Sequence, residues 1–197
     1  RRRDRCTPEE MPQKFGDQIT ADHFVAKAPK DQGNKGETAG LVVCDIGTGW
    51  TDVFPSTFRT ADDALLAMND FAGPKQHVEN IRIDNAPELI QAAKRLGWRT
   101  DRSTPFVSKS NGIIERRVGV VEEGARTVLE RSGLGPTLWP YATRHFAFAS
   151  NITPGKGCKK TAWELRHNSA KFHGQRIPFG AEIDYLPPKP RLKKEPK

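Results

Sequence analysis

The order of the predicted secondary structure elements indicates an α/β protein. Three β-rich segments come first and are joined by loops, as in an antiparallel sheet. Helices then alternate with strands, as in the crossover connections of parallel sheets. The length of 197 residues suits one domain with appendages and is too short for two full-sized domains. We therefore expect a mixed five-stranded sheet that is flanked by helices.

The first three strands follow from alternation and from β-propensity. Residues 17–26 (DQITADHFVA) alternate between polar and apolar, which suits a half-buried strand. A polar, glycine-containing loop separates them from residues 41–47 (LVVCDIG) and 50–56 (WTDVFPS), which are rich in β-formers. A short glycine-containing link joins the last two segments and suits a hairpin.

Capping signals mark the elements that follow. Thr60, with Asp63 three residues later, begins a helix that Gly73 ends. The next elements in order are a strand at 77–84, a helix at 85–97 with Asn85 as its N-cap, a strand at 98–103, and a long helix at 113–133.

A C-terminal helical extension is expected after residue 133. Residues 137–152 are apolar at helical spacing although Pro140 lies among them, and 161–167 suit a short helix. We expect a linker at 1–12, a domain at 13–180 that divides into a core (13–133) and the extension (134–180), and a short strand followed by a basic, proline-rich, disordered tail at 181–197.

The distribution of charge indicates a polyanionic partner. The net charge is +8, and residues 156–197 carry +7 of it, so residues 1–155 are nearly neutral. A basic tail on a neutral body favours nucleic acid as the partner, with a solubilising tail as the alternative.

Cysteine usage and hydropathy exclude several classes of protein. Cys6, Cys44 and Cys158 are odd in number and widely spaced, which argues against a zinc knuckle or a disulfide framework. No run approaches the ~18 apolar residues of a membrane span, and no secretory leader is visible. We expect an intracellular fragment of a longer precursor, without membrane attachment.

Three acidic residues occupy positions that could form one site. Asp22 lies in the middle of the first strand, Asp84 ends the fourth strand, and Glu115 lies in the first turn of the long helix. Groups at the carboxyl ends of strands and in the adjacent helix turns gather at one crevice of an α/β sheet. Carboxylates gathered there could bind hard divalent cations such as Mg²⁺.

Each acid also has an ordinary structural explanation. Asp22 could be paired or face solvent, and Asp84 could help to cap the following helix. Glu115 is favoured in a first turn by the helix dipole. Strand alternation places His23 on the face opposite Asp22, where we expect a structural role. For Asp45 we expect a paired surface acid, with support of the acidic site as the alternative.

Three segments, in this order, resemble the catalytic blocks of retroviral and retrotransposon integrases. They are DQITADHF, IRIDNAPEL and NGIIERR followed by EEGARTVL. The resemblance is greatest to copia-type elements, whose second block reads D-N-x-x-E and whose third reads N-G-x-x-E-R. The segment TAWELRHNSAKFHGQRIPFG is similar to one that follows the core in that group. The resemblance covers roughly residues 13–186.

The resemblance implies an RNase H-like fold and a D,D,E triad formed by Asp22, Asp84 and Glu115. In that family the triad binds two Mg²⁺ or Mn²⁺ ions. The reaction trims DNA 3′ ends with water and then joins them to target DNA. The residues that we expect to bind nucleic acid are Ser108, Lys109, Ser110, Asn111, Arg116, Arg117, Lys156, Lys159 and Lys160.

Several positions depart from the family pattern. Thirty residues separate Asp84 from Glu115, a few fewer than is usual. Val118 and Gly119 stand where copia-type helices continue with Asn and a basic or polar residue. These departures leave the triad intact, but they make a decayed element copy an alternative.

The resemblance implies an integrase catalytic core from an LTR-retrotransposon polyprotein. Its partners would be element and target DNA, further copies of itself and flanking polyprotein domains, and integration would take place in the nucleus. One alternative is a catalytically inactive nucleic-acid-binding module of the same fold. Another is a different RNase H-like nuclease, against which the C-terminal segment TAWELRH…RIPFG argues.

Overall fold

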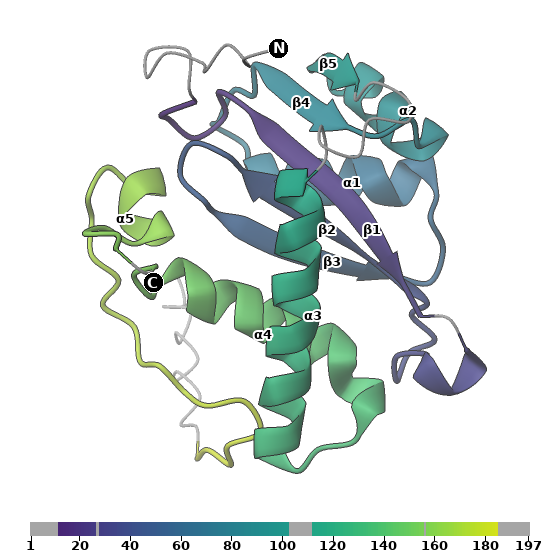
Figure 1. Ribbon diagram of the computed structural model, residues 1–197, viewed down its shortest axis with the longest axis vertical. Coiled ribbons are helices and arrows are strands. Elements are labelled where there is room, and N and C mark those ends of the chain that lie inside the picture. The colour runs from purple at the N-terminus through teal and green to yellow at the C-terminus, as the bar shows by residue number, and fades with distance from the viewer. Residues whose placement is uncertain (1–11, 27, 103–111, 156, 185–197) are drawn as a thin grey trace, which may run out of the picture.

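The computed structural model describes residues 12–26, 28–102, 112–155 and 157–184, in which helices cover both faces of one central sheet (Figure 1). The long helix α3 crosses one face, and α1 and α2 lie behind the other. Among the helices of these segments, none is long and apolar enough to cross a membrane.

The sheet has five strands in the order β3-β2-β1-β4-β5, and it is mixed as predicted. β1 pairs antiparallel with β2, which pairs antiparallel with β3, whereas the pairs β1–β4 and β4–β5 are parallel. The strand bounds are β1 Ile19–Val25, β2 Ala39–Asp45, β3 Thr51–Ser56, β4 Asn80–Ile83 and β5 Arg99–Arg102.

Two hydrophobic clusters fix the helices to the sheet. On one face, α1 (Ala61–Ala72) and α2 (Pro87–Arg95) pack on strand residues that include Ile19, Ala21 and Ile81. On the other face, α3 (Gly112–Ser132) and α4 (Trp139–Asn151) pack on Val42, Cys44 and Val53 through Ile114, Val121 and Ala147. Because alternate residues of a strand face opposite sides, the sheet has a distinct α1/α2 face and α3/α4 face.

Helix starts agree with the predicted caps in one case and differ in another. The Thr60 side chain accepts a hydrogen bond from the Asp63 amide, as predicted for α1. The prediction of Asn85 as the N-cap of α2 is wrong, because the N-cap is Ala86 and Pro87 occupies the first helical position. Proline is favoured there since its fixed φ suits the helix and its missing N–H would be unpaired. Pro140 is accommodated in the same way, within the first turn of α4.

The helices of the extension after α3 end at Arg166. The extension contains a 3₁₀ turn η4 (Pro136–Leu138), α4 and the short helix α5 (Ala162–Arg166); a further 3₁₀ turn, η2 (Pro29–Asp31), follows β1. The described residues beyond α5 form neither helix nor strand, so the short strand predicted at the start of 181–197 is not found over 181–184. Its apolar residue Ile183 is 58% exposed, so burial on a sheet does not stabilise this segment. The predicted linker (apart from residue 12) and tail lie outside the described residues, as do residues 185 and 186.

Candidate active site

Asp22 and Asp84 are neighbours because β1 and β4 run parallel. The register pairs Ile19 with Ile81 and Thr20 with Arg82. Continuing that register by two residues places Asp84, the first residue after β4, beside Asp22. Asp22 alternates with Ala21, which is buried on the α1/α2 face, so the Asp22 side chain belongs to the α3/α4 face.

Glu115 comes to the same face from the first turn of α3. The preceding residue, Ile114, is 1% exposed and packs on the sheet with Val42, which anchors the start of the helix. Glu115 itself is exposed, at the solvent side of that anchor.

Electrostatics show that the three carboxylates interact. The pKa of Asp22 is raised to about 6, mainly by burial, and the nearby carboxylates of Asp84 and Glu115 contribute to this rise. The His23 amide opposes them by donating a hydrogen bond of 2.7 Å to Asp22 Oδ1. Asp22 therefore lies in partly buried, negatively charged surroundings, and such surroundings favour a bound cation.

The carboxylates do not form an assembled metal cage. Within the described segments, no group of three or more His, Cys, Asp or Glu side chains is gathered as metal ligands. Asp22 and Asp84 each use one oxygen locally, since Asp84 Oδ1 accepts a hydrogen bond of 3.0 Å from the Ala86 amide. Asp84 thus also helps to fix the start of the following helix α2, as its position suggested. This hydrogen bond leaves the second carboxylate oxygen available, and oxygen donors of this kind fit Mg²⁺ or Mn²⁺.

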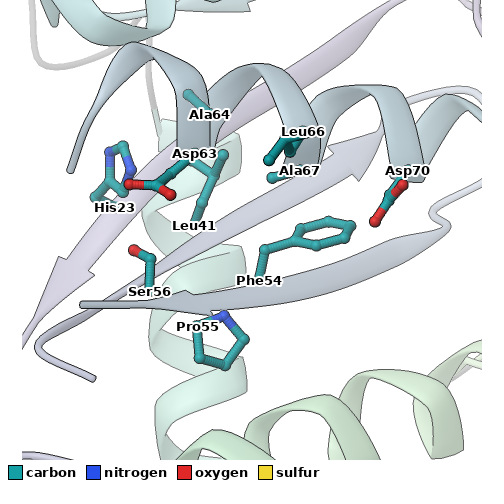
Figure 2. A pocket seen from close by; sticks show the side chains of 10 residues that line it. All are labelled: His23, Leu41, Phe54, Pro55, Ser56, Asp63, Ala64, Leu66, Ala67 and Asp70. Carbon is teal, nitrogen blue, oxygen red and sulfur yellow. The ribbon is translucent and has the colours of Figure 1, made fainter. Parts of the chain in front are cut away.

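His23 lies on the opposite face, as predicted. It lines a cleft of about 190 Å³ between α1 and the strands, together with residues such as Phe54 and Asp63 (Figure 2). Its Nδ1 is 3.9 Å from Glu88 Oε1, and burial lowers its pKa, although the Glu88 carboxylate opposes that shift. The residues that line this cleft include no member of the Asp22–Asp84–Glu115 trio.

The predicted nucleic-acid-binding residues fall into three groups. Arg116, which directly follows Glu115 on α3, is exposed. Arg117, Lys159 and Lys160 line a groove on another side of α3. The remaining predictions, Ser108, Lys109, Ser110, Asn111 and Lys156, lie outside the described residues.

Asp45 is a residue whose role the sequence did not reveal. It is 0% exposed, not a surface acid, and it accepts hydrogen bonds from the Gly16 amide and from both the amide and the hydroxyl of Thr48. Burial raises its pKa while these donors lower it. The signal available in the sequence was the Asp-x-x-Thr spacing at the hairpin, which is typical of a side chain that closes its own turn.

Comparison with solved structures identifies the fold. One match is a chain of the simian T-cell lymphotropic virus intasome in complex with PP2A regulatory subunit B56 gamma, with 19% identity and a TM-score of 0.63. Another is the catalytic core domain of BIV integrase, with 16% identity and a TM-score of 0.55. The chain has the RNase H-like fold of integrase catalytic cores.

The extent of each match delimits this likeness. The intasome match covers 90% of this chain and 64% of the other, so this chain spans less than two thirds of that protein. The BIV match covers 78% of this chain and 95% of the core domain. No family model matches the sequence. At these identities the likeness establishes the fold alone.

Proposed function

We propose that this chain is the catalytic core of an integrase from a copia-type LTR retrotransposon. One observation carries the proposal: Asp22, Asp84 and Glu115 come from three elements, yet they lie close enough for two of them to raise the pKa of the third. Three carboxylates without compensating cations at a sheet edge repel one another, and divalent ions would relieve that repulsion.

The triad would hold two Mg²⁺ or Mn²⁺ ions. Bound there, the ions would supply Lewis-acid activation of a phosphodiester and of the attacking water or 3′ hydroxyl. The chain's own part is to fix the carboxylates: β1 and β4 hold the two aspartates in register, and Ile114 anchors the helix turn that carries Glu115. The reaction class is DNA 3′-end processing followed by strand transfer, with no covalent bond to the protein.

DNA is the proposed substrate and partner. Arg116 is exposed one residue after Glu115, where a guanidinium can bind a backbone phosphate. The +7 charge of residues 156–197 adds nonspecific attraction. Assembly into a homo-oligomer, flanking polyprotein domains and nuclear integration belong to the same proposal. One of the matched structures is an intasome.

The test removes one carboxylate at a time. Asp84→Asn and Glu115→Gln should each lower metal-dependent strand transfer by about a hundredfold or more, because charge stabilisation at the reacting phosphate is lost. Glu123→Gln, an exposed carboxylate on the same helix, is the matched control and should retain activity. Thermal melting should show that all three variants are folded.

Isolated cores can need flanking domains for activity, so metal binding is measured in parallel. Isothermal calorimetry with Mn²⁺ should show binding to the parent chain and to Glu123→Gln, with weaker binding to the two triad variants. Unchanged strand transfer or unchanged Mn²⁺ affinity in either triad variant would refute the site.

A second candidate is an inactive nucleic-acid-binding module of the same fold. It is favoured by the absence of an assembled metal-ligand group among the described residues. This alternative predicts DNA binding that weakens with salt and does not respond to Mg²⁺ or Mn²⁺.

A further inference from the structure

A groove of about 860 Å³ opens beside α3, and its lining residues include no member of the acidic trio. Its walls come from the β2–β3 hairpin, α3, α4, the loop that follows α4, and α5. In Figure 1 these segments border one another to one side of α3, with α5 facing the hairpin end of β2 and β3.

The groove is positively charged. Arg117, Lys159 and Lys160 line it, and the lining residues that the structure describes include no Asp or Glu. Arg117 lies close to Cys44 and to the hairpin. Burial raises the pKa of the Cys44 thiol, and the charge of Arg117 counteracts this rise. A Cβ added to Gly49 in the hairpin would lie 3.9 Å from a guanidinium nitrogen of Arg117. Lys159 and Lys160 are both exposed, and Lys160 donates a hydrogen bond of 2.9 Å to Ser169 Oγ.

The groove also has an apolar wall. Phe146, Ala149, Ala162 and Leu165 line it, and Leu165 is 43% exposed. The Phe146 ring packs so closely on Gly124 that a Cβ added to this glycine would lie 2.2 Å from the ring. An exposed leucine beside a fixed aromatic ring is a site where a partner's apolar side chain can be buried.

Helix geometry separates the groove from the candidate active site. Glu115 and Arg117 are two residues apart on α3, which corresponds to about 200° around a helix at ~3.6 residues per turn. Glu115 therefore faces the aspartates, while Arg117 faces the groove. An occupant of the groove can therefore bind without contacting the acidic trio.

The combination of charge and apolar wall favours a peptide over DNA. Phosphates of a duplex lie on a stiff, convex surface, and an apolar recess adds nothing to their binding. A peptide can bury apolar anchors in a recess while carboxylates contact a cationic rim. We propose that this groove binds an acidic segment of a partner protein, with apolar side chains against Leu165 and Phe146 and carboxylates at Arg117 and Lys159.

The experiment selects short random peptides that bind the folded chain. The comparison variant is Lys159→Glu combined with Leu165→Ser; both residues are exposed, so the fold is retained. Cys158 lines the groove and serves as a reporter. In a Cys6→Ser background, maleimide should modify Cys158, because it is exposed and Cys44 is buried.

Enriched peptides should carry net negative charge and apolar anchors, and they should slow maleimide labelling of Cys158. Their affinity for the double variant should fall by about tenfold or more, as expected when a rim charge is reversed and an anchor contact is lost. Enrichment of neutral or basic peptides, or equal binding to the variant, would overturn the proposal.

Oligonucleotides are tested in the same labelling assay. If single-stranded or duplex DNA protects Cys158 and the selected peptides do not, the groove is a nucleic-acid site and the proposal is wrong. These readouts need no catalysis, so they can succeed or fail independently of the strand-transfer test. Peptide binding with strand transfer intact would show that the groove and the trio act separately.

Discussion

At the scale of single residues, the environment of Asp22 distinguishes it from an ordinary strand aspartate. Its pKa of about 6 means that it is partly protonated in mildly acidic solution. Burial is the main cause of the raised pKa, the His23 amide opposes it, and the Asp84 and Glu115 charges add to it. A metal ion binds the deprotonated carboxylate and therefore competes with a proton for it. Metal binding and protonation at this site should be opposed.

This competition gives a pH prediction. Mn²⁺ or Mg²⁺ affinity should rise as pH increases through about 6, where Asp22 loses its proton. Carbon-13 NMR of the Asp22 carboxyl should show its pKa lowered by saturating Mg²⁺. In Glu115→Gln the pKa should be lower than in the parent chain even without metal, since one raising charge is gone. A carboxyl titration that is unaffected by Mg²⁺ would mean that Asp22 is not a ligand.

At the scale of elements, the interior of α3 has two glycines, Gly119 and Gly124, in different surroundings. Gly119 has no heavy atom within 4 Å of its Cβ position, whereas the Phe146 ring lies 2.2 Å from that of Gly124. Gly124 therefore permits the close approach of α4 to α3. Gly119, one of the departures from the copia pattern, has no such packing reason.

These surroundings predict opposite effects of the same substitution. Gly119→Ala should raise the free energy of unfolding by about 0.5–1 kcal/mol, because alanine favours the helix and nothing obstructs its methyl group. Gly124→Ala should lower it by about 1–3 kcal/mol through overpacking against Phe146. Urea denaturation of both variants measures the difference. Equal effects at the two positions would contradict the helix packing described.

Local patterns predicted the elements well where the signal lay within the element. Thr60 capped its helix as expected, and strand alternation placed Asp22 and His23 on opposite faces. Predictions of elements failed where another residue changed the local structure, or where no neighbouring strand was available for pairing. Pro87 moved the start of α2 past Asn85, and residues 180–184 formed no strand. A sequence pattern shows that a segment could be a strand, but not whether a sheet edge is available to it.

Long-range contacts were beyond the reach of sequence patterns. Asn151, at the end of α4, is buried and pairs with both the amide and the carbonyl of Thr51 on β3, one hundred residues away. Asp45 likewise joins the hairpin to Gly16. Such contacts depend on how α4 and the N-terminal segment dock. The same holds for the groove, where Arg117, Lys159 and Lys160 meet only after folding.

At the scale of the whole molecule, Arg166 joins α5 to three other parts of the chain. Its guanidinium carbon lies 4.1 Å from the ring centroid of Phe15, 4.5 Å from that of Trp50 and 5.7 Å from that of Phe71. It also donates a hydrogen bond of 2.9 Å to the Phe71 carbonyl at the end of α1. The extension after α4 is thus fastened to the core by α5, at the side of the molecule where the groove lies.

These contacts predict that even a conservative substitution of Arg166 lowers the stability of the fold. Arg166→Lys keeps the charge but loses the planar group that stacks on the rings and reaches the carbonyl, so the free energy of unfolding should fall by about 1–3 kcal/mol. Arg131→Lys, at an exposed position on α3, is the control and should change it by less than about 0.5 kcal/mol. Limited proteolysis should cut Arg166→Lys faster near α5 than the parent chain. Equal melting of the two lysine variants would show that the extension is held by other contacts, and the groove wall formed by α5 would then persist without Arg166.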